Sequence, residues 1–263
     1  MTTLTEPTTR TLDVPGATLT YDIRKGDSPA PVLLLIGSPM GAGGFGTLAA
    51  HFRDRTVVTY DPRGVERSAK ADPASPSTPE QHADDVRRII AHEPPLASVL
   101  PDREGAMAFT QAIHDTYRRR GFGAGMAQFI VAVSYKGPIT PEFAAQPGPD
   151  PAMFGLPTED DGSRTDALLG QNIVTGTHYE PDFAALRAAS TRIVMAAGAE
   201  SEGEMAHRGA EAVAERLGTK PVIFPSGHGG FLGGEYGQAG DPDAFAAKLR
   251  EVLAQAQETR PRR

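Results

Sequence analysis

The chain contains no cysteine among its 263 residues. Disulfide bonds, thiolate catalysis and metal sites with cysteine ligands are therefore excluded. Long apolar segments are also lacking: the longest strongly apolar run, Val32–Ile36, is far shorter than the roughly 20 residues of a membrane-spanning helix. Because the amino-terminal segment MTTLTEPTTR has no basic start and no apolar stretch, we expect no signal peptide, no membrane contact and a cytoplasmic location.

Positive charge is scarce as well. The formal net charge is −7, and arginines cluster only at Arg118–Arg120 and in the tail Arg260–Arg263. A protein that binds nucleic acid needs a cationic face, so we expect no nucleic acid partner. No two histidines have the spacing of the metal-binding H-E-x-x-H pattern, and we expect neither a metal nor another cofactor.

The hydrophobic pattern predicts an α/β fold. Residues 11–24 alternate around a Pro-Gly turn, which is typical of a β-hairpin. The apolar runs 31–37 and 55–61 predict strands buried on both faces, and the helical pattern at 45–52 between them predicts a parallel pair. The other predicted elements are helices at 78–90, 204–218 and 241–257 and strands at 192–198 and 221–227.

The length of the chain fits one large domain or a domain with an inserted cap. Residues 96–180 carry helical patterns that are broken by glycine and proline. We therefore predict a helical cap at 96–180 and a core made of residues 1–95 and 181–263. The oligomeric state is not predicted.

The glycine-rich segment Gly41–Gly46 matches G-x-G-x-x-G. It follows a predicted strand, and Asp61 ends the next strand twenty residues later, as in the dinucleotide-binding motif of oxidoreductases. That motif follows its strand closely, whereas Gly37–Met40 intervene here. In a second interpretation the turn exposes a backbone N–H to a developing oxyanion, and Ser38 is the donor because Pro39 has no N–H. A merely flexible loop is the third interpretation.

Two late segments carry residues suited to acid–base chemistry. His228 lies in the glycine-rich sequence SGHGGF directly after a predicted strand, a position typical of a general base. Glu200 follows the preceding strand and is suited to orient an imidazole, with Glu93 as the alternative acid. The structural alternatives are an exposed loop histidine and acids that stabilise a helix amino terminus.

The order of these segments resembles the α/β-hydrolase family. The resemblance covers the opening hairpin, LLLIGSPMGAGGF, YDPRGVERS, AHEPPL, AAGAES and GHGGF. It implies a mostly parallel sheet with flanking helices and a helical cap, and a hydrolase of an ester or related acyl compound with a small-molecule substrate. It also implies His228 as the base, Glu200 as its acid and Ser38 as an oxyanion-hole donor.

One part of the family pattern is missing. In that family a G-x-S-x-G turn between a strand and a long helix carries the nucleophile. No serine of this chain lies in that motif, and Asp85–His92 is too short for a strand–turn–helix–strand unit of roughly 30 residues. The elbow is absent between Ile90 and Ala91. We therefore expect a sheet without its central strands and an enzyme that is inactive or impaired.

Two arrangements of such a sheet are possible. Strand 31–37 pairs directly with strand 192–198, or residues 87–92 leave the predicted helix and fill the gap. Either arrangement loosens the core, because a central layer contributes apolar burial at about 25 cal/mol per Å².

Ser201 is an alternative candidate for the nucleophile. It lies in an A-x-S-x-G sequence between a predicted strand and a helix, but two flanking glutamates disfavour an alkoxide there. Two alternatives to a hydrolase remain open. One is a non-catalytic protein of the same fold that binds a small ligand, and the other is a nucleotide-binding oxidoreductase that uses Gly41–Gly46.

Overall fold

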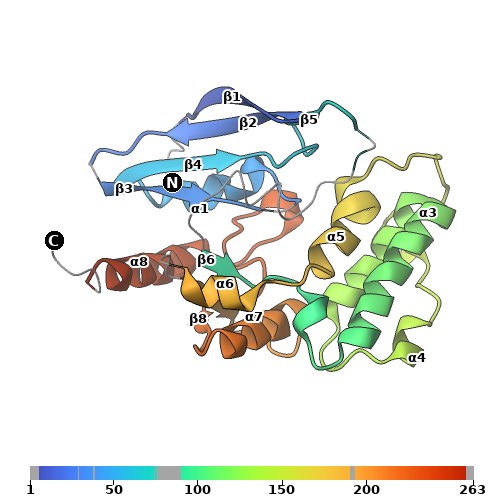
Figure 1. The fold of residues 1–263 in the computed structure, drawn as a ribbon. Helices are drawn as coiled ribbons and strands as arrows, with labels where there is room; N and C mark the ends of the chain where they lie inside the picture. The colour runs from blue at the N-terminus through green and yellow to red at the C-terminus, as the bar shows by residue number, and fades with distance from the viewer. Residues whose placement is uncertain are drawn as a thin grey trace. The chain divides into compact units, whose positions relative to one another are not determined.

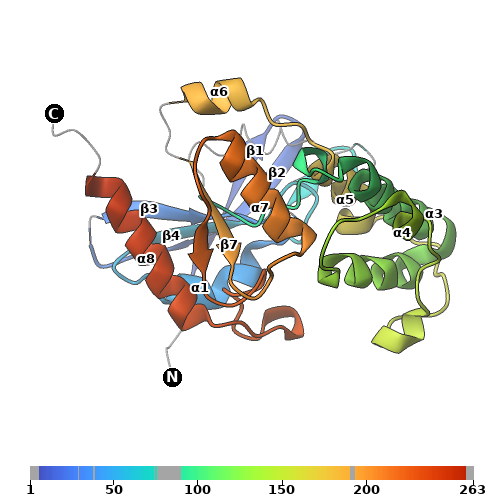
Figure 2. The same cartoon turned by 90° about the horizontal axis from the view of Figure 1, so that it is seen from below.

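The computed structural model (Figures 1 and 2) describes residues 6–28, 30–37, 39–73, 75, 90–189 and 193–258. The chain divides into two compact units. The first comprises Met1–Pro73, Gly198–Glu200 and Phe224–Arg263, and the second comprises Ala74–Ala197 and Ser201–Ile223. Both units combine strands and helices, which confirms the predicted α/β class. The boundaries predicted for the core and the cap stay a prediction.

The first unit contains a five-stranded sheet. Its strands are β1 (Thr8–Val14), β2 (Ala17–Arg24), β3 (Ala30–Leu35), β4 (Arg55–Tyr60) and β5 (Ala69–Lys70). The order is β1-β2-β4-β3, and β5 pairs with β2. The antiparallel pair β1–β2 confirms the predicted hairpin, and β3 runs parallel to β4 as predicted.

The prediction that strand 31–37 is buried on both faces is wrong. Along β3, Leu33 and Leu35 are each 8% exposed, whereas Val32 is 61% exposed and Leu34 is 36% exposed. This alternation is typical of a strand that is covered on one face only. β3 is also the last strand in the order of its sheet among the described residues.

Helices complete the first unit. The turn η1 (Ala42–Phe45) and the helix α1 (Gly46–Ala50) follow β3, where a helix was predicted. The closing helix α8 (Pro242–Glu258) begins after Asp241, whose Oδ1 accepts a hydrogen bond from Ala244 N at 3.0 Å. Asp241 thus satisfies a backbone N–H in the first turn of the predicted helix 241–257. The short turn η5 (Glu235–Gly237) lies between β8 (Val222–Phe224) and α8 in the chain.

A second sheet has the order β6-β7-β8. Its strands are β6 (Ile90–His92), β7 (Val194–Gly198) and β8 (Val222–Phe224). β6 runs parallel to β7, with Ile90 opposite Val194. Because β7 lies between β6 and β8, the arrangement in which strand 31–37 pairs with it directly is wrong. The predicted helix at 78–90 lies outside the described residues up to position 89, and Ile90 begins β6.

The rest of the second unit is helical. Its helices are η2 (Ala97–Val99), α3 (Arg103–Ser134), α4 (Pro141–Ala144), η3 (Pro151–Phe154), η4 (Leu168–Asn172), α5 (Ile173–Thr177), α6 (Phe183–Ala188) and α7 (Met205–Arg216). Gly121, with a φ of 81°, interrupts α3 and divides it into two arms (Figure 2). The arms pack on a core that includes Ile113, Tyr117 and Leu169. Among the described helices, none has both the length and the apolar character needed to cross a bilayer.

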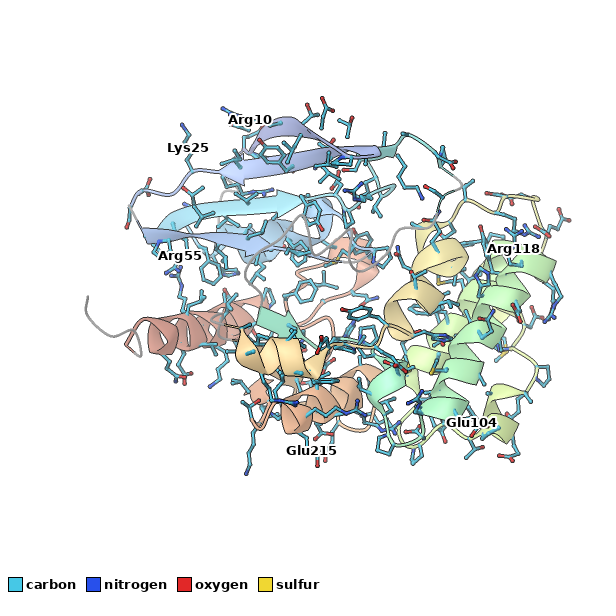
Figure 3. The ribbon with its side chains drawn as sticks, in the orientation of Figure 1. Arg10, Lys25, Arg55, Glu104, Arg118 and Glu215 are labelled. Carbon is cyan, nitrogen blue, oxygen red and sulfur yellow. The ribbon has the colours of Figure 1, made fainter. Side chains whose placement is uncertain are left out.

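The arginine cluster Arg118–Arg120 is exposed at the end of the first arm of α3, as Figure 3 shows for Arg118. Glu104 lies in the first turn of the same helix, and Glu215 lies on the exposed side of α7 (Figure 3). These charges lie in solvent, where they contribute little to stability.

Acidification is expected to destabilise the second unit through His178. This histidine follows α5, and its Nε2 lies 2.8 Å from Thr110 Oγ1. Burial lowers the pKa of His178 below its ordinary value of 6.5. The unfolded chain therefore binds the proton more tightly, so the stabilisation is complete above pH 6.5 and is lost as the pH falls towards the folded-state pKa.

Urea titrations at pH 7 and pH 5 check this expectation. The free energy of unfolding should be lower at pH 5, and the difference should be smaller in His178→Gln than in the wild type. An equal difference in the two proteins would show that His178 does not contribute to the pH dependence.

Candidate active site

The loop that carries His228 is anchored to the end of β7 in the first unit. We call Ser226–Phe231 the His228 loop. Ala199 N donates to Phe224 O at 2.9 Å, and Glu200 N donates to Ser226 O at 3.0 Å. His228 itself is exposed, as a base that meets a substrate must be. The two residues predicted as base and acid, His228 and Glu200, are thus carried by adjacent loops.

Gly198 makes this close approach possible. A Cβ atom at Gly198 would lie 2.7 Å from Ser226 O and 2.8 Å from Gly227 Cα, so no side chain fits there. Ser226 has a φ of 65°, which is strained for a residue with a side chain. Its Oγ donates to Glu200 Oε2 at 3.4 Å. Ser226 was not singled out in the sequence, since no local pattern shows that it faces Glu200.

The segment Gly41–Gly46, which we call the glycine loop, packs against the end of the His228 loop and lies beside contacts of the residues that follow that loop. The rings of Phe45 and Phe231 stack with centroids 5.5 Å apart. Glu235 accepts hydrogen bonds from Thr47 N at 3.0 Å and from Gly233 N at 2.6 Å. Burial would raise the pKa of Glu235, but these hydrogen bonds keep it below its ordinary value, so the carboxylate is charged. Both loops therefore form one continuous part of the first unit.

Ser38 lies outside the described residues, so its role as an oxyanion-hole donor stays a prediction. The glycine loop, which follows Ser38 in the chain, is held by the side chain of Asp61. This carboxylate is 0% exposed and accepts hydrogen bonds from Ala42 N at 2.7 Å and from Arg67 Nε at 2.7 Å. Asp61 thus holds the start of η1 against the end of β4.

These contacts do not favour the nucleotide-binding interpretation. Asp61, the acid assigned to the ribose in that interpretation, is buried and already hydrogen-bonded within the protein. In addition, a Cβ atom at Gly41 would lie 2.5 Å from Glu66 Cδ. A carboxylate therefore lies against the backbone that a pyrophosphate would approach, and like charges repel.

Glu93 and Ser201 are brought together in the second unit, in a buried cluster. Ser201 Oγ donates to Glu93 Oε1, and His207 Nδ1 lies 3.4 Å from Ser201 Oγ and 3.5 Å from Glu93 Oε1. Glu93 is 0%, Ser201 1% and His207 4% exposed. A substrate cannot reach a serine buried in this way, so the cluster offers no support for Ser201 as a nucleophile or Glu93 as a catalytic acid.

His207 was not singled out as a site residue. The available signal is its position on the apolar face of α7, where Met205, Ala210 and Val213 are also buried. A helix places residues three and four apart on one face, so that spacing indicates burial of His207 but not its partners. Its Nε2 lies 3.6 Å from Oε1 of the half-exposed Glu211.

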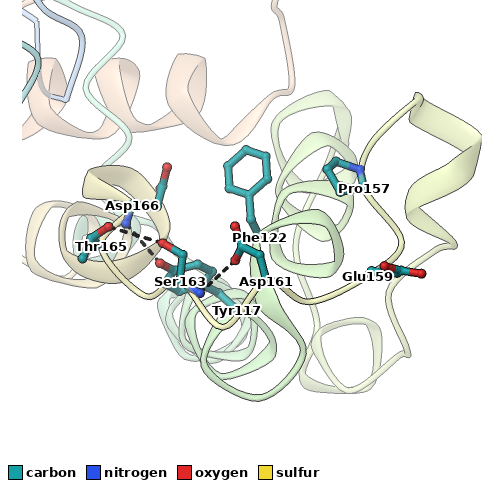
Figure 4. A pocket seen from close by; sticks show the side chains of 8 residues that line it. All are labelled: Tyr117, Phe122, Pro157, Glu159, Asp161, Ser163, Thr165 and Asp166. Atoms are coloured by element: carbon teal, nitrogen blue, oxygen red, sulfur yellow. Dashed lines mark hydrogen bonds between the residues drawn. The ribbon is translucent and has the colours of Figure 1, made fainter.

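A separate cavity of about 330 Å³ lies in the second unit (Figure 4). Its lining residues are Tyr117, Phe122, Pro157, Glu159, Asp161, Ser163, Thr165 and Asp166. Two of its carboxylates support the local backbone: Asp161 Oδ1 accepts from Ser163 N at 2.8 Å, and Asp166 Oδ1 accepts from Leu169 N at 2.7 Å. Of the residues predicted as catalytic that the structure describes, none lines this cavity. Within the described ranges, no group of three or more His, Asp or Glu side chains is arranged to hold a metal.

No protein-family model matches the chain. One curated protein is similar in sequence, the uncharacterized hydrolase YraK of Bacillus subtilis strain 168. The two are 29% identical over 263 aligned positions, which span 84% of this chain and 89% of the relative.

Solved structures show a stronger likeness in fold than in sequence. A variant of the N-acyl homoserine lactonase AidH, in complex with N-hexanoyl homoserine, has a TM-score of 0.56 at 13% identity, covering 98% of this chain and 100% of that one. A putative lipase of Acinetobacter baumannii AYE has a TM-score of 0.56 at 16% identity, and the match covers 97% of this chain and 93% of the lipase. A thermophilic esterase of Thermogutta terrifontis has a TM-score of 0.53 at 16% identity, and the match covers 95% of this chain and 99% of the esterase. The chain therefore has the α/β-hydrolase fold.

Proposed function

We propose that this chain is a hydrolase-type protein that binds an ester or related acyl compound and, being impaired, turns it over only at a slow residual rate. The observation that carries the proposal is the packing of three segments in the first unit. The His228 loop, the turn at Glu200 and the glycine loop are connected by the hydrogen bonds and the ring stack described above. His228 acts as a base on water, and Glu200 orients its imidazole.

Turnover is expected to be slow because the chain lacks a recognisable nucleophile. Covalent acyl transfer needs an activated nucleophile, and no serine of this chain lies in a G-x-S-x-G turn. In a serine hydrolase, loss of the nucleophile alone lowers kcat by about 10⁶-fold, while binding and the oxyanion hole keep a residual rate about 10³–10⁴-fold above that in water. A base that activates water in such a site is expected to work in this residual range.

Two observations support the loss of a segment. The alignment with the Bacillus relative has 263 positions but spans only 84% of this chain of 263 residues, so the relative has positions without a counterpart here. The apolar side chains of Val32 and Leu34 are exposed on β3, as expected for a strand that lacks a covering layer. An elbow unit missing between Ile90 and Ala91 accounts for both.

The test combines three measurements on the purified protein. Ethyl butyrate should raise the melting temperature, p-nitrophenyl butyrate should be hydrolysed only at a residual rate that His228→Ala abolishes, and a fluorophosphonate probe should not label the chain. Ligand binding with no hydrolysis in either protein would identify a non-catalytic ligand-binding protein. Labelling that persists in Ser201→Ala would contradict the proposal, because it requires another serine nucleophile.

A further inference from the structure

Two residues with side chains adopt left-handed backbone conformations beside the glycine loop. Glu66 has a φ of 45° and Tyr236 has a φ of 54°. Tyr236 Oη donates a hydrogen bond to Glu66 Oε1 at 3.2 Å. Such conformations cost free energy and are concentrated at functional sites. The coincidence of two of them in one hydrogen-bonded pair therefore points to a role for the pair.

Both side chains lie on the glycine loop. A Cβ atom at Gly41 would lie 2.5 Å from Glu66 Cδ, and one at Gly44 would lie 3.1 Å from Tyr236 Cε2. Glu66 is exposed, and Tyr236 is 62% exposed. The carboxylate of Glu66 is thus held against the loop backbone while it stays accessible to a molecule in solution.

The charge of Glu66 is not balanced locally. Asp61 is paired with Arg67, and Glu235 accepts two backbone hydrogen bonds. Among the described residues, no lysine or arginine pairs with Glu66, and its hydrogen-bond donor is the neutral hydroxyl of Tyr236. Burial and the nearby Glu66 carboxylate raise the pKa of Tyr236, so the hydroxyl keeps its proton.

We propose that Glu66 determines the charge preference of the acyl-binding site, favouring compounds that carry a positive charge beyond the carbonyl group. The inference rests on the proposed function. Its physical basis is that an accessible carboxylate attracts a cation and repels an anion that is bound within a few ångströms. Tyr236 acts as a positioning residue, because its hydroxyl holds one oxygen of Glu66.

Three ethyl esters with the same trimethylene spacer test the inference by calorimetric titration. They are ethyl 4-(trimethylammonio)butanoate, its uncharged isostere ethyl 5,5-dimethylhexanoate, and the anion of monoethyl glutarate. The wild type should bind the cationic ester about five-fold more tightly than the isostere, as expected for one contact between charges in water. The anionic ester should bind more weakly than the isostere. Salt should reduce both differences.

Relative to the isostere, Glu66→Gln should lose about five-fold in affinity for the cationic ester and should gain affinity for the anionic ester. Glu215→Gln, which removes an exposed carboxylate of α7 (Figure 3), should keep the wild-type preference. If the isostere binds but Glu66→Gln keeps the preference for the cation, the inference is wrong and the acyl-binding site stands. If none of the three esters binds, the proposed function and this inference are both wrong.

Discussion

Replacing Asp61 by alanine is expected to lower the free energy of unfolding by about 3 kcal/mol. The carboxylate is 0% exposed and accepts hydrogen bonds from Ala42 N at 2.7 Å and from Arg67 Nε at 2.7 Å. Ala42 is only 1% exposed, so its N–H would lose an acceptor that water cannot easily replace. The cost exceeds the worth of the hydrogen bond because the Ala42 N–H stays desolvated, whereas Arg67 is 42% exposed and keeps its pairing with Asp22.

Thermal and urea unfolding followed by circular dichroism measure this effect. A loss of about 3 kcal/mol corresponds to a fall in melting temperature of roughly 6–12 °C in a chain of this size. Asp13→Ala is the matched control, because Asp13 accepts a hydrogen bond from Thr18 Oγ1 at 2.7 Å on the exposed hairpin. Asp13→Ala should lower the free energy of unfolding by less than about 0.5 kcal/mol. Equal losses in the two variants would show that Asp61 does not hold the glycine loop.

Ser201→Ala is expected to cost about 2 kcal/mol of stability without any direct effect on catalysis. Ser201 Oγ donates to Glu93, whose carboxylate is 0% exposed. The alanine variant leaves that carboxylate with one donor fewer in a place that water does not reach. Glu93 also has a φ of 47°, so its backbone is held in a strained conformation after β6.

The control for this prediction is Ser134→Ala. Ser134 also makes a hydrogen bond, to Ile130 O at 2.9 Å, but it is exposed. Its loss should change stability by less than about 0.5 kcal/mol. The difference in free energy of unfolding between the two serine variants, measured by urea titration, gives the contribution of the Ser201 hydrogen bond in the buried cluster. If Ser201→Ala is as stable as Ser134→Ala but abolishes labelling by a fluorophosphonate, Ser201 is a nucleophile after all and the structural interpretation fails.

Local patterns in the sequence were sufficient for most elements of the first unit. The Pro-Gly turn between β1 and β2, the paired apolar runs of β3 and β4 and the capped helix α8 depend on residues close together in the chain. They were predicted correctly because alternation and capping act over a few residues. The burial of β3 was predicted wrongly, because the exposure of Val32 and Leu34 depends on which parts of the chain cover the faces of the strand.

The sequence by itself determined that no serine stands in an elbow motif and that His228 follows a strand in a glycine-rich loop. Only the tertiary structure decided that Ser201 and Glu93 meet His207 in the interior, and that Glu66 meets Tyr236 across the glycine loop. The physical reason is the range of each effect. Composition and motifs are properties of consecutive residues, whereas burial and contacts between residues as far apart as Glu66 and Tyr236 arise only when the whole chain packs.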